Sequence, residues 1–261
     1  MPRTRLVVLA LLFLVATGQK VVLGEEPRSL QALKDRAAQS SASAQLDLGG
    51  KYSWGIGVPQ DYAEAVKWYN LAAAQGSASA QSNLGVMYAK GQGVPQDYTE
   101  AVKWYRLAAT QRLDGAQYNL GLMYVKGQGV PQDYTEAMKW YRLAAAQGVA
   151  LAQYNLGFMY ANGQGVPQDY AEAVKWYRLA AAQGHVDAQI NLGRSCALGQ
   201  GIPQDNAQAH MWFNLAAARA TGEELVRAVK LRETIATLMT PAQIAEAQKL
   251  AREWQPTPPG K

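Results

Sequence analysis

A self-match at a fixed spacing of 36 residues constrains this chain more than any other feature of its sequence. The run Val-Pro-Gln-Asp-Tyr recurs at this spacing, and its last copy is altered to Ile-Pro-Gln-Asp-Asn. The five copies begin at Val58, Val94, Val130, Val166 and Ile202. A tryptophan keeps the same step from Trp68 to Trp212 and is expected to hold one packing position in every unit. Such a period predicts a repeat protein in which each unit is one supersecondary structure.

The first half of each unit shows the apolar spacing of an amphipathic helix. In the second unit Ala80, Leu84 and Tyr88 follow one another at intervals of four residues and so share one helical face. Gly91 and Gly93 come next, and glycine accepts the positive φ that is common at helix ends. The pattern predicts a helix followed by a tight loop.

The second half of each unit begins with a helix-capping pattern. Pro95 cannot continue the preceding helix, Asp97 is suited to an N-cap, and Glu100 follows three residues later, as in a capping box. The pairing recurs in the other units and ends as Asp205 with Gln208. Because the pairs mark helix starts, we interpret them as caps rather than as catalytic carboxylates.

A pair of helices this short cannot bury its apolar face alone, so neighbouring pairs must stack. The sequence therefore predicts an all-α solenoid of about five helix-loop-helix repeats over residues 44–222. A helix within residues 27–43 is expected to cap the N-terminal end, and helices over residues 223–255 the C-terminal end. In the second of these, Thr240 suits the N-cap and Pro241 the first helical position. Residues 256–261 are expected to form a frayed tail.

Residues 1–24 have the layout of a secretory signal peptide. Arg3 and Arg5 precede an apolar run that ends at Ala16, and small residues follow. The run is shorter than the ~20 residues that span a bilayer. Cleavage is expected after Gly18 or Gly24, and an uncleaved anchor is the alternative. We therefore expect a periplasmic or secreted protein with no stable membrane span after signal removal.

The charge balance argues against a nucleic-acid partner. The formal net charge is +5, but three of the 25 basic residues lie in the first 24 residues, which carry no acidic residue, so the remainder has a charge of about +2. A nucleic-acid-binding surface needs a stronger basic excess. Cys196 is the only cysteine, which excludes an intramolecular disulfide, and we expect it to fill space as a buried thiol.

No catalytic, cofactor-binding or metal-binding constellation can be recognised. His185 and His210 lie in different repeats and lack partners at zinc-ligand spacing. The Ser-x-x-Lys and Gly-x-Ser-x-Gly motifs of serine hydrolases are absent. The Gly-x-Gly loops lack a third glycine and follow no predicted strand, so they indicate turns rather than phosphate sites. The sequence predicts a protein without enzymatic activity and without a cofactor.

Ala116-Gln-Tyr-Asn-Leu-Gly-Leu-Met-Tyr-Val-Lys-Gly-Gln-Gly-Val130, followed by Asp133, Trp140 and Ala144, resembles a Sel-1-like repeat. These repeats are longer relatives of tetratricopeptide repeats, and the resemblance covers about residues 40–220. It implies a right-handed superhelix whose first helices line the concave side. It also implies a role as an adaptor or scaffold, which in exported bacterial members is associated with envelope functions and host-protein contacts.

One cysteine-rich branch of the resembled family has been linked to β-lactam binding or hydrolysis, with a disulfide in each repeat. The present sequence departs from that branch because Cys196 stands alone, in the place of the tyrosines Tyr52, Tyr88, Tyr124 and Tyr160. This departure removes most of the reason to expect the same enzymatic activity.

One face of the first helices changes its chemistry from repeat to repeat while the packing positions stay constant. Tyr118 and Tyr154 are informative on this face because the repeat pattern does not require them. The three variable positions, four residues apart, hold Leu46, Ser82, Tyr118, Tyr154 and Ile190; then Gly50, Val86, Leu122, Phe158 and Arg194; then Trp54, Lys90, Lys126, Asn162 and Leu198. A variable face with aromatic residues is typical of a ligand groove, and ordinary drift on an exposed face is the alternative.

The leading functional hypothesis is an exported scaffold whose concave groove, centred on repeats three and four, binds a peptide or protein. The candidate binding residues are Tyr118, Leu122, Lys126, Tyr154, Phe158, Asn162, Ile190 and Arg194. Aromatic rings would supply contact area, and the polar members would orient polar groups or a carboxylate. Two alternatives remain: an envelope hydrolase acting on β-lactam or peptidoglycan-like substrates, and a structural spacer whose concave face is filled by the C-terminal helices.

Overall fold

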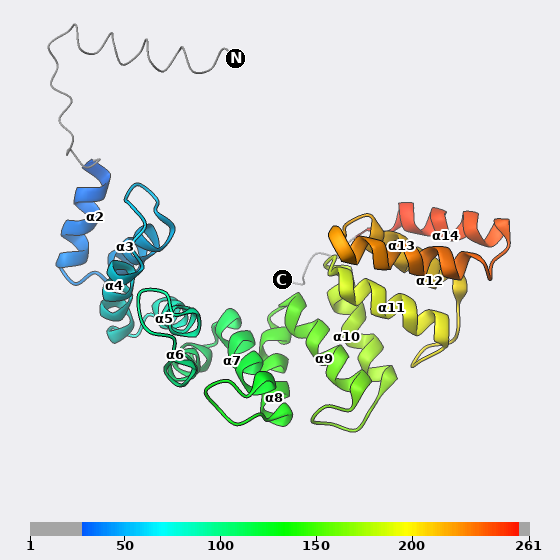
Figure 1. The fold of residues 1–261 in the computed structure, drawn as a ribbon, viewed down its shortest axis with the longest axis horizontal. Coiled ribbons are helices and arrows are strands. Elements are labelled where there is room, and N and C mark those ends of the chain that lie inside the picture. The colour runs from blue at the N-terminus through cyan, green and yellow to red at the C-terminus, as the bar shows by residue number, and fades with distance from the viewer. Residues whose placement is uncertain (1–27, 256–261) are drawn as a thin grey trace, which may run out of the picture.

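The computed structural model describes residues 28–255, which form thirteen helices and no strand. The predicted signal peptide and the predicted C-terminal tail lie outside these residues. The helices stack side by side into an arch, with α2 (Arg28–Ala38) at one end and α14 (Pro241–Glu253) at the other (Figure 1). The all-α solenoid expected from the 36-residue period is confirmed. None of the described helices is long and apolar enough to cross a membrane.

Each repeat contributes two antiparallel helices. The first helices are α3 (Ala42–Trp54), α5 (Ala78–Lys90), α7 (Asp114–Lys126), α9 (Ala150–Asn162) and α11 (Val186–Leu198). The second helices are α4 (Tyr62–Ala74), α6 (Tyr98–Thr110), α8 (Tyr134–Ala146), α10 (Tyr170–Ala182) and α12 (Asn206–Ala217). In Figure 1, α5 and α7 lie on the inner side of the arch, and α6 and α8 lie on its outer side.

The core repeats with the sequence because a tyrosine of each of the first four second helices packs over a glycine of a first helix. A Cβ atom on Gly157 would lie only 2.6 Å from the ring of Tyr177, so a side chain there would clash with the ring. Gly85 and Tyr105 have the same relation, and Phe213 replaces the tyrosine in the last repeat. The solenoid core is therefore a row of small clusters, each shared by neighbouring helix pairs.

The recurring tryptophans pack as expected, but none of them is fully buried. Trp104 contacts the buried residues of α4 and α5, and Trp140 contacts those of α6 and α7. Both side chains keep an intermediate exposure. The sequence pattern identifies the packing position, whereas the degree of burial depends on how closely the next repeat stacks.

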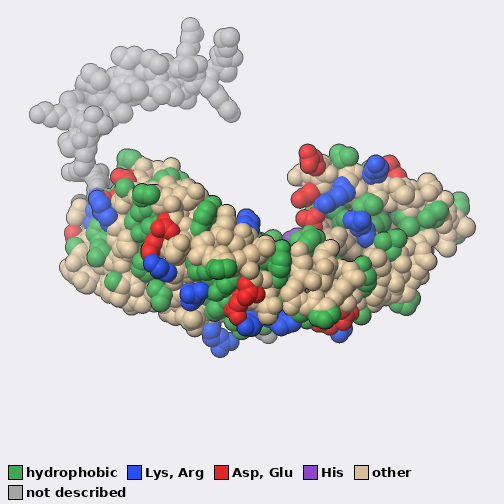
Figure 2. Space-filling view, turned by 60° about the horizontal axis from the view of Figure 1, so that its bottom comes forward, with side chains coloured by type: hydrophobic (Ala, Val, Ile, Leu, Met, Phe, Trp, Pro, Cys, Tyr) green, Lys and Arg blue, Asp and Glu red, His purple; other side chains and the backbone are tan. Residues whose placement is uncertain are grey.

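The second helices begin at the predicted N-caps, although the capping boxes are only half formed. Oδ1 of Asp97 accepts hydrogen bonds from the backbone N–H groups of Thr99 and Glu100. The Glu100 carboxylate does not return to the Asp97 backbone but pairs with Lys103, and the equivalent pairs recur on α4, α8 and α10. In Figure 2 basic and acidic side chains lie close together over the outer face of the arch. The expected reciprocal box is therefore wrong for these helices, because the lysine one turn on is the better partner for the glutamate.

The C-terminal helices cover the last repeat. Helix α13 (Gly222–Ala236) packs on α12 and reaches α11, and α14 packs on α12. Thr240 caps α14, with a reciprocal bond between Gln243 and the Thr240 backbone, and Pro241 occupies the first turn. The sequence analysis placed a helix start at this residue.

Candidate functional site

Within residues 28–255, the first helices line four cavities, in two groups that each share an exposed aromatic side chain. Around Trp54 lie the N-terminal cavity, of about 680 Å³ between α2, α3 and α5, and the smaller Trp54 cleft, of about 160 Å³ between α3 and α5. Around Phe158 lie the Phe158 cleft, of about 250 Å³ between α7 and α9, and the Arg194 cleft, of about 290 Å³ between α9 and α11. The first helices therefore form the walls of an interrupted groove.

The Phe158 cleft brings together three of the predicted binding residues. Leu122 of α7 lines one side, and Tyr154 and Phe158 of α9 line the other. The Phe158 side chain is 42% exposed, whereas Leu122 and Tyr154 are half-buried. Asn155 and Gln164 add polar groups to this mainly apolar lining. Repeats three and four therefore share a mainly apolar cleft at three of the candidate residues.

Tyr154 is held in place by rings on three sides. Its ring stacks on His185 at a centroid distance of 4.7 Å and lies 6.1 Å from Tyr177 and 6.4 Å from Phe158. Burial raises the pKa of the Tyr154 hydroxyl, and a hydrogen bond with Asn191 offsets part of that rise. These contacts fix the ring at the edge of the cleft, so Tyr154 links α9 to the next repeat as well as lining the groove.

Tyr118 has a similar position one repeat earlier, but it does not line the Phe158 cleft. Its ring lies 5.7 Å from that of Tyr141, which does line the cleft. Burial raises the pKa of Tyr118, and a hydrogen bond with Asn155 lowers it. Tyr118 therefore supports the floor of the groove instead of facing a ligand directly.

The polar candidates divide into two groups. Asn162 and Arg194 are exposed and line the Arg194 cleft together with Phe158. The amide Nδ2 of Asn162 donates to the Phe158 carbonyl at 2.7 Å, which holds the side chain against its own helix. Lys126 is exposed but lines none of the four cavities. Of the three, Arg194 has the charge and position to orient a carboxylate.

Ile190 does not belong to the groove, and its prediction as a binding residue is wrong. The side chain is only 1% exposed and packs with Ala216 and Ala228. Ala228 belongs to α13, which lies outside the repeats and covers this end of α11. The same helix leaves Phe158 exposed, so the C-terminal helices cover only the end of the variable face.

The sequence analysis missed a tyrosine and an asparagine that recur on the groove floor. Tyr69, Tyr141 and Tyr177 reach the cavities from the second helices. Asparagines on the first helices lie beside them, at Asn83, Asn155 and Asn191. Burial raises the pKa of Tyr177, and a hydrogen bond with Asn191 again offsets part of the rise. These asparagines are separated by multiples of 36 residues, and that recurrence was the signal that could have revealed this polar row.

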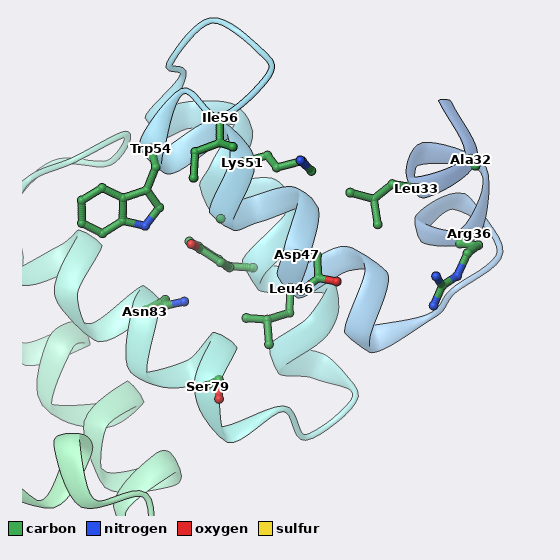
Figure 3. Close-up of a pocket in the computed structure, with 12 residues that line it drawn as sticks. Ala32, Leu33, Arg36, Leu46, Asp47, Lys51, Trp54, Ile56, Ser79 and Asn83 are labelled. Carbon is green, nitrogen blue, oxygen red and sulfur yellow. The ribbon is translucent and has the colours of Figure 1, made fainter. Parts of the chain in front are cut away.

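Trp54 and Ile56 were also missed as candidate site residues. Trp54 is 76% exposed and lines both cavities at the N-terminal end. Figure 3 shows it facing the same space as Asn83, with Ile56 beside it at the end of α3. Trp54 takes the position that Lys90 and Asn162 occupy in other repeats, so comparison of the repeats could have identified it.

Cys196, His185 and His210 are at least partly buried near the C-terminal end of the repeats. Cys196 is fully buried, as expected, and burial raises the pKa of its thiol to about 11. Burial lowers the pKa of both His185 and His210. Among the described residues, no group of three or more His, Cys, Asp or Glu side chains could hold a metal ion.

Comparisons with known proteins agree with this architecture. The family profile of the Sel1 repeat matches residues 42–77, 78–113, 115–149, 150–185 and 186–220. A Sel1 repeat protein from Oxalobacter formigenes is 34% identical, with a TM-score of 0.75 over 87% of this chain and 93% of that one. The protein c5321, a protective antigen present in uropathogenic Escherichia coli strains, is also 34% identical, with a TM-score of 0.67.

The match to c5321 covers 86% of this chain but only 56% of that chain, so the present chain spans about half of that structure. A search of curated proteins found no significant match. The five repeat matches account for most of the chain and coincide with the helix pairs of the structure. The chain belongs to the Sel1 repeat family.

Proposed function

We propose that this protein is a binding scaffold whose groove holds an extended peptide segment of a protein partner at repeats three and four. Sel1 repeat proteins commonly act as protein-interaction scaffolds. The observation that supports this site is Phe158, a large apolar side chain that remains 42% exposed where two clefts meet. An exposed aromatic ring in a concave, mainly apolar setting is typical of an interaction site.

The Phe158 and Arg194 clefts offer complementary chemistry to such a segment. The first would accept an apolar side chain against Leu122, Tyr154 and Phe158. The second would place a carboxylate or a backbone carbonyl near Arg194 and Asn191. A peptide lying across α9 would contact both clefts, since Phe158 belongs to each.

The test of this proposal is the variant Phe158→Val, which copies Val86 of the second repeat. Because Phe158 is exposed and Val86 is tolerated at the equivalent position, we expect helicity and melting temperature close to those of the unchanged protein. Affinity for a partner captured from cell-envelope extract should fall at least five-fold, which corresponds to about 1 kcal/mol. The control Leu143→Gln changes an exposed leucine outside the cavities and should leave affinity unaltered. Full-strength binding by Phe158→Val would refute the site.

We further propose that the protein acts outside the cytoplasm after removal of 18 to 24 residues. The support is the pattern of Arg3, Arg5 and the apolar run to Ala16. N-terminal sequencing of the protein from fractionated cells tests this proposal. A full-length product in the cytoplasmic fraction would contradict it.

A further inference from the structure

Two exposed aromatic side chains mark the two halves of the groove. Among the tryptophan and phenylalanine side chains of residues 30–255, only Trp54 and Phe158 are exposed. Each is shared by two cavities, Trp54 at the N-terminal end and Phe158 on α9. Aromatic rings that remain exposed in concave surroundings are the side chains that most often anchor a partner.

The N-terminal cavity forms a second apolar seat that the proposed function does not use. Leu33 of α2 approaches from one side, and Leu46 and Trp54 of α3 form the other, with Ile56 in the loop after α3 (Figure 3). Ile56 is 58% exposed, so this end of the groove presents two large apolar side chains to solvent. Asn83 lies beside Trp54, as Asn155 lies beside Phe158. The two seats therefore combine an exposed aromatic ring with a neighbouring amide.

The charges that line the groove favour an acidic ligand. Five charged side chains line the four cavities: Arg36, Lys51, Lys90, Arg194 and Asp47. Four of them are basic, and none forms an ion pair with another described residue. The ion pairs of the described residues lie elsewhere, on the second helices and between Arg227 and Asp187. A ligand that carries negative charge beside its apolar anchors would match this distribution, since Arg36 and Lys51 lie near Trp54 and Arg194 lies near Phe158.

We propose that the groove binds a single acidic, extended peptide segment at two points, with one apolar side chain at Trp54 and a second at Phe158. This inference rests on the proposed function and adds the chemistry and the spacing of the ligand. Helices α3 and α9 are three repeats apart. Because packed helices lie ~10 Å apart, the two anchors are separated by roughly 30 Å. An extended chain advances ~3.3 Å per residue, so the two apolar residues should be roughly nine positions apart.

Two-point binding makes the affinity depend on the distance between the anchors. Once one side chain is seated, the second binds intramolecularly, and its gain is lost when the linker cannot span the two seats. The probes are fluorescein-labelled peptides of Glu, Ser and Gly that carry two tryptophans three, six, nine or twelve residues apart. Peptides with one tryptophan and a peptide with none serve as references. We expect the nine-residue spacing to bind at least ten-fold more tightly than either single-anchor peptide in fluorescence anisotropy.

Affinity that does not change with spacing would overturn the two-point model. Replacing the glutamates of the best peptide by lysines should weaken binding at least ten-fold at low salt, because the lining is mainly basic. Equal binding of the basic peptide would overturn the assignment of an acidic ligand. If no peptide binds more tightly than the one without tryptophan, the two-point model and the proposed peptide groove both fail.

Matched variants separate this inference from the proposed function. Trp54→Asn copies Asn162, and Phe158→Val copies Val86. Each substitution should lower the affinity for the best peptide to that for a peptide with a single tryptophan. Leu143→Gln is the control outside the groove and should bind like the unchanged protein. If Trp54→Asn has no effect while Phe158→Val weakens binding, the second anchor is refuted and the proposed function stands. If only Trp54→Asn weakens binding, the assignment to repeats three and four fails together with the two-point model.

Discussion

The guanidinium of Arg219 lies over the ring of Trp254, 5.2 Å from its centroid, at a position where the four preceding repeats have a glutamine. In those repeats the glutamine donates through Nε2 to the Oε1 of a second glutamine on the first helix. The pairs are Gln75 with Gln45, Gln111 with Gln81, Gln147 with Gln117 and Gln183 with Gln153, at 2.7 to 2.8 Å. Oε1 of Gln189 in the fifth repeat has no partner. The relay of glutamines therefore ends where Arg219 turns to the C-terminal helix.

The relay predicts that Gln117→Ala destabilises the protein more than Gln189→Ala does. Gln117 accepts a bond from Gln147 and donates to the Ala109 carbonyl, so its removal loses two hydrogen bonds, or about 2 kcal/mol. Gln189 makes only the equivalent donor bond, to Ala181, and its removal should cost about 1 kcal/mol. Urea unfolding of the two variants measures the difference. Equal losses would show that the glutamine pairs add nothing to stability.

The contact between Arg219 and Trp254 predicts a local effect of Trp254→Ala. Trp254 also meets Trp212 edge-on at a centroid distance of 6.0 Å, so the variant removes both an aromatic pair and a cation–π contact. In a stack of repeats each unit contacts only its neighbours. We expect faster amide hydrogen exchange in α14, with unchanged exchange in α5 to α8. Faster exchange along the whole arch would contradict this local role.

Adjacent glycines of α3 predict opposite outcomes for the same substitution. A Cβ atom on Gly49 would lie 2.6 Å from the Tyr69 ring, whereas one on Gly50 would meet only the Tyr69 hydroxyl, at 3.9 Å. Gly49→Ala should therefore cost about 1–3 kcal/mol through overpacking. Gly50→Ala should be neutral or stabilising by up to about 1 kcal/mol, because alanine favours the helix. Melting curves of the two variants compare them directly, and a stable Gly49→Ala protein would show that the tyrosine can move aside.

The repeating part of the fold could be predicted because every unit carries the same local signals. The loop glycines are an example: Gly93 has a φ of 72°, and a Cβ atom on it would lie 2.3 Å from the Tyr62 carbonyl oxygen. The positive φ and the close contact each involve only one unit or two neighbouring units, so they recur with the 36-residue period and can be predicted from it. The sequence likewise placed the start of α14 at Thr240, since an N-cap and a following proline act within one helical turn.

The candidate site was predicted less completely because its residues depend on contacts outside the repeat pattern. Ile190 occupies a variable position, but α13, which is no part of the repeats, buries it. Trp54, by contrast, occupies a position that is exposed in the other repeats as well, as at Lys90 and Leu198, so comparison of the repeats could have identified it. Phe158 and Leu122, which the sequence analysis named as candidates, line one cleft because a spacing of 36 residues places equivalent positions side by side.

The two histidines predict that the protein loses stability in mild acid. Burial lowers the pKa of His185 and of His210 in the folded state. Asp187 and Glu224 oppose this shift at His185, and Arg232 reinforces it at His210. The histidines of the unfolded chain therefore bind protons more readily than those of the folded protein. The stability that depends on neutral histidines is fully present above the ordinary histidine pKa of about 6.5. It declines as the pH falls below that value toward the lowered pKa of the folded state.

The variant His185→Ser assigns part of this acid sensitivity to one residue. Nδ1 of His185 accepts a hydrogen bond from the Ala188 N–H at 3.3 Å, which protonation of that nitrogen would abolish. Serine caps α5 in the same way from the equivalent position, Ser77, so the variant keeps an N-cap while it loses the titrating group and the stacking on Tyr154. Between pH 7.5 and 5, the melting temperature of this variant should fall less than that of the unchanged protein. The variant His210→Val, which copies Val174 of the preceding repeat, should reduce the fall in melting temperature further. If both variants follow the pH dependence of the unchanged protein, the carboxylates and not the histidines govern its stability in acid.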